Sequence, residues 1–387
     1  MSRFLFVVPP LTGHVNPTVS VARALAADGH EVAWAAHADV VAPLLPAGAK
    51  LYSLGEARAN EFLAPQVEKS RDVRGLESLQ FLWEELIVPL ARATRPGIEK
   101  VIAGYAPDVI IVDQQAVGGA LAARRSGRPW ATFCTTSAGV TNPLAGLPKV
   151  KAWVDARLGE LESEAGLPPA VTPDLSPTRV IVFSTDALVG STDAFPPSYR
   201  FVGPSIADRP EATPFPWEAL EPGRRHVLVS LGTVSHDRGG DFYDVVARAF
   251  GETPWQIILV APDGRMATPP ANFIVRPRVP QLALLPHMHA VVSHGGHNTV
   301  CESLAHGVPL VVTPIRDDQP VIADQVVRSG AGLRLKFGRL TPAALQAAIT
   351  RLFDEPSFAT AAARVRASFA AAGGAQAAAR LLLELAA

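Results

Sequence analysis

The chain has 387 residues, of which 48% are hydrophobic and 18% charged, and its formal net charge is -1. This length is typical of two domains, and the balanced charge, without basic or acidic blocks, argues against a nucleic-acid partner. The two cysteines, Cys134 and Cys301, are too few for a disulfide framework and favour a reducing cytoplasm. Pro9 and Pro10 interrupt the apolar start of the chain, so it predicts a first strand rather than a signal peptide. No apolar run is long enough to form an integral membrane segment.

The first elements follow a strand–helix–strand pattern. Residues 4–8 form an apolar run typical of a parallel strand that is buried on both faces. After a polar loop, Asn16 is a good N-cap and Pro17 a good first helical residue, and Gly29 ends the predicted helix. Residues 31–36 predict the next strand, which completes a βαβ unit.

The same alternation continues to about residue 205, and a second series begins near residue 226. The expected later strands are 108–113, 130–134, 179–184 and 199–203 in the first series, and 226–232, 256–261, 273–275, 290–294, 310–314 and 333–337 in the second. Residues 206–225 are rich in Pro and charge and predict an interdomain linker. Thr341 and Pro342 predict the start of a late helix. The domains are therefore expected at 1–205 and 226–370, and residues 371–387 are expected to form a helix that packs back on the first domain.

This order predicts an α/β fold with two Rossmann-like, doubly wound parallel sheets. Such sheets bind ligands at the carboxyl ends of their strands. Two of them joined by a linker can face each other across a cleft. The stretches 56–105 and 135–178 are too long for simple connections and suit the binding of a large apolar molecule.

The stretch "VVSHGGHNTVCESLAHGVPLVVTPIRDDQP" (291–320) contains a candidate anion site. A strand is followed by a glycine loop and a predicted helix start near Asn298, where N–H groups and the helix dipole favour phosphate. Glu302 lies one turn further on the same face as Asn298 and suits ribose hydroxyls. Asp318 and Gln319 end the next strand and suit sugar hydroxyls. By itself, however, a glycine loop of this kind is common to many βα units.

The histidines near this loop also allow a metal site. His287, His289, His294 and His297 are the candidates, but no cysteine pair accompanies them. His289 and His294 are expected at opposite ends of one strand. Phosphate binding is therefore the preferred interpretation, and no metal ligand is assigned.

The segment from Arg276 to Pro320 resembles the nucleotide-sugar box of family 1 glycosyltransferases, the UDP-glycosyltransferase superfamily with the GT-B fold. "TGHVNP" near the N-terminus and "VSLGT" (229–233) stand at the places where that family has related motifs. The bacterial members that the chain resembles most glycosylate polyketides, macrolides, carotenoids and flavonoids. The resemblance implies a hexosyltransferase that needs no cofactor and uses a UDP- or dTDP-sugar as donor and a hydrophobic small molecule as acceptor, as a monomer or homodimer.

The resemblance also implies residue roles. His14 is the catalytic base and Asp113 orients it. The donor-binding residues are Gly13, Ser230, Gly232, Thr233, Arg278, Val279, Gln281, His294, Gly296, Asn298, Thr299, Glu302, Asp318 and Gln319. Plant members have Trp where this chain has Arg278, and a planar guanidinium could stack on the pyrimidine in its place.

The predicted chemistry follows from the weakness of a hydroxyl as a nucleophile. An imidazole such as that of His14 can take the hydroxyl proton during attack. A carboxylate bonded to the other ring nitrogen fixes the tautomer, as in hydrolase triads. Attack opposite the leaving diphosphate inverts the anomeric carbon.

Three other functions compete with this interpretation. A GT-B nucleotide-sugar 2-epimerase would need a closed, acidic pocket in the first domain. A non-catalytic glycosyltransferase activator usually lacks an intact donor box. A nicotinamide dehydrogenase is disfavoured because no G-x-G-x-x-G follows the first strand. Consumption of the sugar nucleotide only in the presence of an acceptor would separate these functions from a glycosyltransferase.

Overall fold

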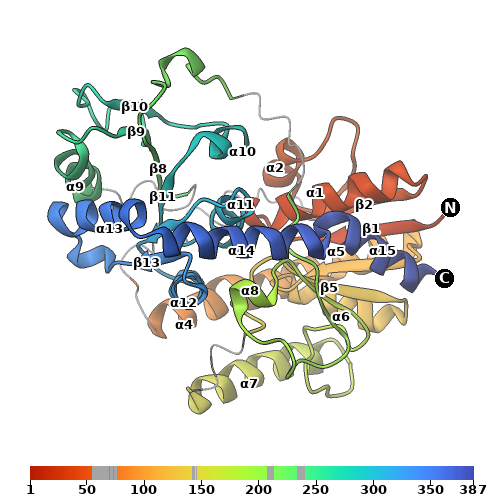
Figure 1. The fold of residues 1–387 in the computed structure, drawn as a ribbon. Helices are drawn as coiled ribbons and strands as arrows, with labels where there is room; N and C mark the ends of the chain where they lie inside the picture. The colour runs from red at the N-terminus through yellow and green to blue at the C-terminus, as the bar shows by residue number, and fades with distance from the viewer. Residues whose placement is uncertain are drawn as a thin grey trace. The chain divides into compact units, whose positions relative to one another are not determined.

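A computed structural model describes residues 1–54, 69, 73, 76–141, 144, 146–206, 213–232 and 240–387 (Figure 1). The chain divides into two compact units. The first comprises Met1–Ser184, Thr192–Ala207 and Ala372–Ala387, and the second comprises Thr185–Ser191 and Asp208–Ala371. Among the described residues, no helix is both long and apolar enough to cross a bilayer.

The described part of the first unit contains a seven-stranded parallel sheet in the order β3-β2-β1-β4-β5-β6-β7. Its strands are β1 (Arg3–Val7), β2 (Glu31–Ala36), β3 (Lys50–Ser53), β4 (Val109–Asp113), β5 (Trp130–Cys134), β6 (Val180–Val182) and β7 (Tyr199–Phe201). Strands β4 and β5 are buried along their whole length, which explains their continuous apolar sequences.

Helices cover both faces of this sheet. They are α1 (Thr12–Ala27), α2 (Ala38–Val41), η1 (Ala42–Leu44), α4 (Leu76–Phe81), the π-helical η2 (Leu82–Ile87), α5 (Val88–Tyr105), α6 (Val117–Ser126), α7 (Pro148–Glu164) and α15 (Gly374–Ala386). Phe4 and Phe6 of β1 pack toward α1 and α15, whereas Leu5 and Val7 pack toward α5 and α6. Figure 1 shows α15 beside α1, and the two helices are in contact.

The described part of the second unit contains a six-stranded parallel sheet in the order β10-β9-β8-β11-β12-β13. Its strands are β8 (His226–Ser230), β9 (Gln256–Val260), β10 (Phe273–Arg276), β11 (Ala290–Ser293), β12 (Leu310–Val312) and β13 (Gly332–Arg334). Its helices are α8 (Asp186–Val189), η3 (Trp217–Ala219), α9 (Gly240–Phe250), α10 (Gln281–Leu284), η5 (Leu285–His287), α11 (His297–Ala305), α12 (Gln319–Ser329), η6 (Phe337–Arg339), α13 (Pro342–Asp354) and α14 (Pro356–Ala372). The predicted cap of α13 is confirmed, because Thr341 accepts a hydrogen bond from Ala344 N.

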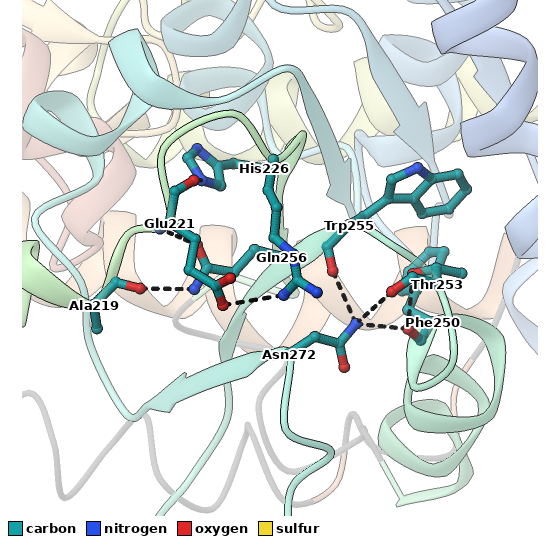
Figure 2. A network of polar contacts seen from close by, with 9 residues as sticks. Ala219, Glu221, His226, Phe250, Thr253, Trp255, Gln256 and Asn272 are labelled. Atoms are coloured by element: carbon teal, nitrogen blue, oxygen red, sulfur yellow. Dashed lines mark hydrogen bonds and ion pairs between the residues drawn. The ribbon is translucent and has the colours of Figure 1, made fainter.

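Side-chain amides bind the start of the second unit to its sheet (Figure 2). Gln256 of β9 donates to Ala219 O at 2.7 Å and accepts from Glu221 N at 2.9 Å. The described end of the proline-rich stretch, residues 213–225, is thus attached to this sheet. The remainder of the predicted linker, apart from residue 206, lies outside the described residues.

Three details differ from the sequence expectation. Helix α1 begins at Thr12 rather than after Asn16, so Pro17 lies inside the helix and His14 in its first turn. Burial of Val15 and the contact between His14 and Asp113 stabilise this extra turn, although the proline lacks an N–H donor. The last predicted strand is shorter, since residues 337–339 form η6. Strand β3 was not predicted, because this short edge strand has only half-buried apolar residues.

Candidate active site

Each described sheet has a point where the connections that follow two neighbouring parallel strands run in opposite directions along the sheet. In the first sheet this point lies between β1 and β4, and in the second between β8 and β11. At such a point the loops at the carboxyl ends of the two strands separate and leave a crevice for a ligand. Of the predicted catalytic residues, His14 follows β1 and Asp113 ends β4, and most of the predicted phosphate-binding residues end or follow β8 and β11.

His14 and Asp113 are in direct contact at the first of these points. His14 Nδ1 lies 2.9 Å from Asp113 Oδ1 and 3.0 Å from Oδ2. The Asp113 side chain is fully buried, whereas the His14 side chain is 14% exposed. The imidazole can therefore be reached from solvent while its partner cannot. Gly13 precedes His14 in the first turn of α1.

Thr135 completes this cluster and was not predicted from the sequence. It follows β5, the strand next to β4, and its Oγ1 lies 2.6 Å from Asp113 Oδ2 and 2.8 Å from His14 Nδ1. Gln115 N also donates to Asp113 Oδ1 at 2.9 Å. The position of Thr135 in the sequence could have revealed it. Its buried hydroxyl comes directly after β5, and in a parallel sheet the residues that follow neighbouring strands lie at the same edge as Asp113.

In the second unit, the His294 ring lies between two glycines. A Cβ atom on Gly232 would lie 2.5 Å from His294 Cε1, and one on Gly296 would lie 2.7 Å from His294 Nε2. Gly232 also has a φ of 71°, which disfavours other residues. Its N–H donates to Ser230 Oγ at 3.2 Å. Ser230, Gly232, His294 and Gly296 therefore form one cluster where β8 and β11 end.

The first turn of α11 adds further groups to this edge. Its N-cap is Gly296, and Asn298 and Thr299 are half-buried in its first turn. N–H groups at the start of a helix can donate to an anion. Glu302 is buried, and its Oε2 accepts from Gln281 Nε2 at 2.6 Å. The structure therefore brings Glu302 and Gln281 together from different segments.

Asp318 and Gln319 lie where the loop after β12 enters α12. Asp318 is the N-cap residue and is half-buried. Gln319 is buried, and its Oε1 accepts from Ile315 N at 2.8 Å and from Arg316 N at 3.1 Å. The Gln319 oxygen therefore holds its own loop. The loop is tight, since Asp317 has a φ of 55°.

Arg278 and Val279 lie between β10 and α10. Arg278 is exposed and Val279 is half-buried. Thr233 lies outside the described residues.

The two cysteines are unsuited to nucleophilic chemistry. Both are buried, and burial raises the pKa of the Cys134 and Cys301 thiols well above their usual range. His297 Nε2 lies 3.4 Å from Cys301 Sγ, and both residues belong to α11. In the described residues, no group of three or more His, Cys, Asp and Glu side chains is arranged to hold a metal ion.

A family model described as "UDP-glucoronosyl and UDP-glucosyl transferase" matches residues 161–367, more than half of the chain. The chain belongs to this glycosyltransferase family. The matched residues include both edges of the second sheet and every predicted donor-binding residue except Gly13.

Characterised relatives of this glycosyltransferase extend over almost its whole length. It is 29% identical to 4'-demethylrebeccamycin synthase of Lentzea aerocolonigenes, over 96% of each chain. It is also 29% identical to demethyllactenocin mycarosyltransferase of Streptomyces fradiae, over 97% of this chain and 84% of the relative.

Solved structures show the same fold. A glycosyltransferase of kitacinnamycin matches with a TM-score of 0.80 and 26% identity, over 100% of this chain and 99% of the other. A calicheamicin glycosyltransferase matches with a TM-score of 0.79 and 23% identity, over 100% and 98%. The glycosyltransferase therefore has the GT-B fold, as the order of its strands and helices predicts.

Proposed function

We propose that this enzyme is an inverting glycosyltransferase that moves a sugar from a UDP- or dTDP-sugar to a hydroxyl of a hydrophobic natural product. The observation that carries the proposal is the hydrogen bond between His14 and Asp113 at the ligand-binding point of the first sheet. The names of the relatives support the acceptor class, since they include a rebeccamycin synthase and a macrolide glycosyltransferase, that of oleandomycin. The first unit would bind the acceptor and the second the nucleotide sugar.

In this mechanism His14 takes the proton of the acceptor hydroxyl as it attacks the anomeric carbon. Asp113 accepts from Nδ1 and stabilises the imidazolium that forms. The glycine loop, the N-terminal end of α11 and His294 stabilise the leaving diphosphate. We propose that no metal ion takes part, so that activity would persist in EDTA. Activity that is lost in EDTA and restored by a divalent ion would contradict this part.

The deciding experiment measures nucleoside diphosphate release from UDP- and dTDP-glucose, with and without a panel of polyketide, macrolide, flavonoid and carotenoid acceptors. We expect release only with an acceptor, and a product whose anomeric configuration, read by NMR, is inverted. Consumption of the donor without an acceptor would indicate an epimerase. Binding of nucleotide without turnover in any combination would indicate an activator.

The His14→Ala variant tests the base. We expect turnover to fall by about 10²–10⁴-fold, as for a lost general base, with little change in donor affinity. Near-normal turnover would exclude His14 from this role. Asp113→Asn should act in the same direction more mildly.

Arg278 is proposed to stack on the pyrimidine, which would allow both UDP- and dTDP-sugars. Arg278→Ala should then weaken nucleotide binding equally at low and high salt, whereas a salt-sensitive loss would indicate attraction to the diphosphate. Unchanged affinity would mean that the exposed guanidinium does not touch the nucleotide.

Asp318 and Gln319 are proposed to bind the sugar. Alanine at either position should raise the KM for the sugar nucleotide more than the Kd of the bare nucleotide. Equal losses for both ligands would contradict this assignment.

A further inference from the structure

The hydroxyl of Thr135 touches both members of the His14–Asp113 pair. Its Oγ1 lies 2.6 Å from Asp113 Oδ2 and 2.8 Å from His14 Nδ1. Thr135 is 3% exposed, and the Asp113 side chain is fully buried. The three side chains meet at the carboxyl edge of three adjacent strands. His14 lies in the first turn of the helix after β1, Asp113 is the last residue of β4, and Thr135 directly follows β5.

The positions of the protons follow from this arrangement. Suppose that the Thr135 proton pointed to His14 Nδ1. Nδ1 would then present a lone pair to both Asp113 oxygens at 2.9–3.0 Å, and a lone pair of Oγ1 would face Oδ2 at 2.6 Å. Both contacts would be repulsive. The Thr135 hydroxyl must therefore donate to Asp113, and His14 Nδ1 must carry a proton that it shares among the surrounding oxygens.

With this assignment, Asp113 accepts from three groups. These are His14 Nδ1, the Thr135 hydroxyl and Gln115 N. The Thr135 contact has the short distance typical of a hydroxyl that donates to a carboxylate. Besides His14, the Thr135 hydroxyl and Gln115 N hold the carboxylate, and Thr135 also touches the imidazole.

We propose that Thr135 is a positioning residue, whose hydroxyl holds the Asp113 carboxylate and the His14 ring in the orientation that directs Nε2 to the acceptor hydroxyl. This inference rests on the proposed role of His14 as base. Thr135 itself exchanges no proton with the substrate. Its contribution is to restrict rotation of two groups whose geometry determines the rate of proton transfer.

The test compares Thr135→Val, which keeps the shape and loses the hydroxyl, with Thr135→Ser, which keeps the hydroxyl and loses the methyl group. We expect kcat of the valine variant to fall about tenfold with KM unchanged, since one hydrogen bond is worth roughly this factor. The serine variant should stay near wild type. Normal turnover in Thr135→Val, or a larger loss in Thr135→Ser than in Thr135→Val, would overturn the proposal in favour of simple packing.

A second measurement is independent of turnover. In protein labelled with ¹⁵N-histidine, the His14 Nδ1–H proton should give a downfield signal in the wild type and in Thr135→Ser. That signal should be lost or moved in Thr135→Val, and His14→Gln identifies it by its absence. An unchanged signal in Thr135→Val would contradict the proposal. If His14→Ala retained turnover, His14 would not be the base. The Nδ1–H signal of the proteins that keep His14 would still report whether Thr135 holds the ring.

Thr132→Val is the matched control, since it makes the same replacement of a hydroxyl by a methyl group within β5, the strand that Thr135 directly follows. The Thr132 hydroxyl accepts from Ser176 N at 2.8 Å and does not take part in the His14 cluster. This variant should lose thermal stability without the change in kcat or in the His14 signal. If Thr135→Val does not fold, Thr135→Ala is measured in its place, with the same expectations for kcat and for the signal.

Discussion

At the scale of single residues, the contact of His294 with two glycines gives a direct prediction. Gly296→Ala would place a Cβ 2.7 Å from His294 Nε2, so the ring must move. We expect the affinity for UDP or dTDP to fall by about tenfold, the effect of one lost hydrogen bond, with the fold retained. Isothermal titration calorimetry measures this loss.

The control for this variant is Gly338→Ala in the same unit, where an added Cβ would meet open space. Gly338→Ala should leave nucleotide affinity unchanged. Wild-type affinity in Gly296→Ala would show that the position of His294 does not matter for the diphosphate.

Asp174 gives a prediction about pH. Burial raises the pKa of this carboxyl to about 6, from an ordinary value near 4. The folded chain therefore holds the proton more tightly than the unfolded chain, and stability is lost as the pH rises from about 4 to 6. Asp174→Asn cannot ionise, so its melting temperature should exceed that of the wild type increasingly over this range.

Differential scanning calorimetry between pH 4 and pH 7 tests this prediction. Asp263→Asn, at an exposed position, is the control and should follow the wild type. If the melting temperatures of Asp174→Asn and wild type changed in parallel with pH, the prediction would be wrong.

At the scale of elements, Asn272 joins helix α9 to strands β9 and β10. Its Nδ2 lies 2.9 Å from Phe250 O, 3.3 Å from Thr253 O and 2.8 Å from Trp255 O. Figure 2 shows these three contacts as dashed lines. Asn272→Ala would remove the side-chain donor from the carbonyl groups of Thr253 and Trp255, whereas Phe250 O would keep its hydrogen bonds from Thr253. The variant should cost about 1–3 kcal/mol of unfolding free energy.

Asn272→Asp has nearly the same shape but brings a carboxylate toward three carbonyl oxygens. It should therefore lower the free energy of unfolding more than the alanine variant does, when both are measured by urea unfolding. An aspartate variant as stable as wild type would show that the amide donors are unimportant.

At the scale of the whole molecule, the C-terminal helix α15 belongs to the core of the first unit. Leu382 is fully buried there and belongs to the same hydrophobic core cluster as Leu25 of α1. Leu382→Ala should lower the free energy of unfolding by about 2–5 kcal/mol, which is typical of the cavity left by a buried leucine. Leu147→Ala changes the same atoms at a side chain that is 40% exposed and should cost much less. Similar midpoints of denaturation for the two variants would contradict a structural role for α15.

The sequence by itself determined the fold class and most strands, because buried parallel strands need continuous apolar runs such as 109–112 and 227–229. It also placed His14, Asp113 and His294 at the carboxyl ends of their strands, since the ends of apolar runs are visible in a single sequence. Helix starts were less certain. The Asn16–Pro17 signal is local, whereas the contact of His14 with Asp113 joins residues 99 positions apart.

The tertiary structure decided which polar groups meet. Thr135 reaches Asp113 only because β5 pairs with β4, and Gln281 reaches Glu302 only because α10 and α11 follow different strands of one sheet. Strand order arises from the packing of helices on both faces, which depends on the whole chain rather than on neighbouring residues. The sequence therefore identified most of the chemical groups of the candidate site, and the fold determined their partners.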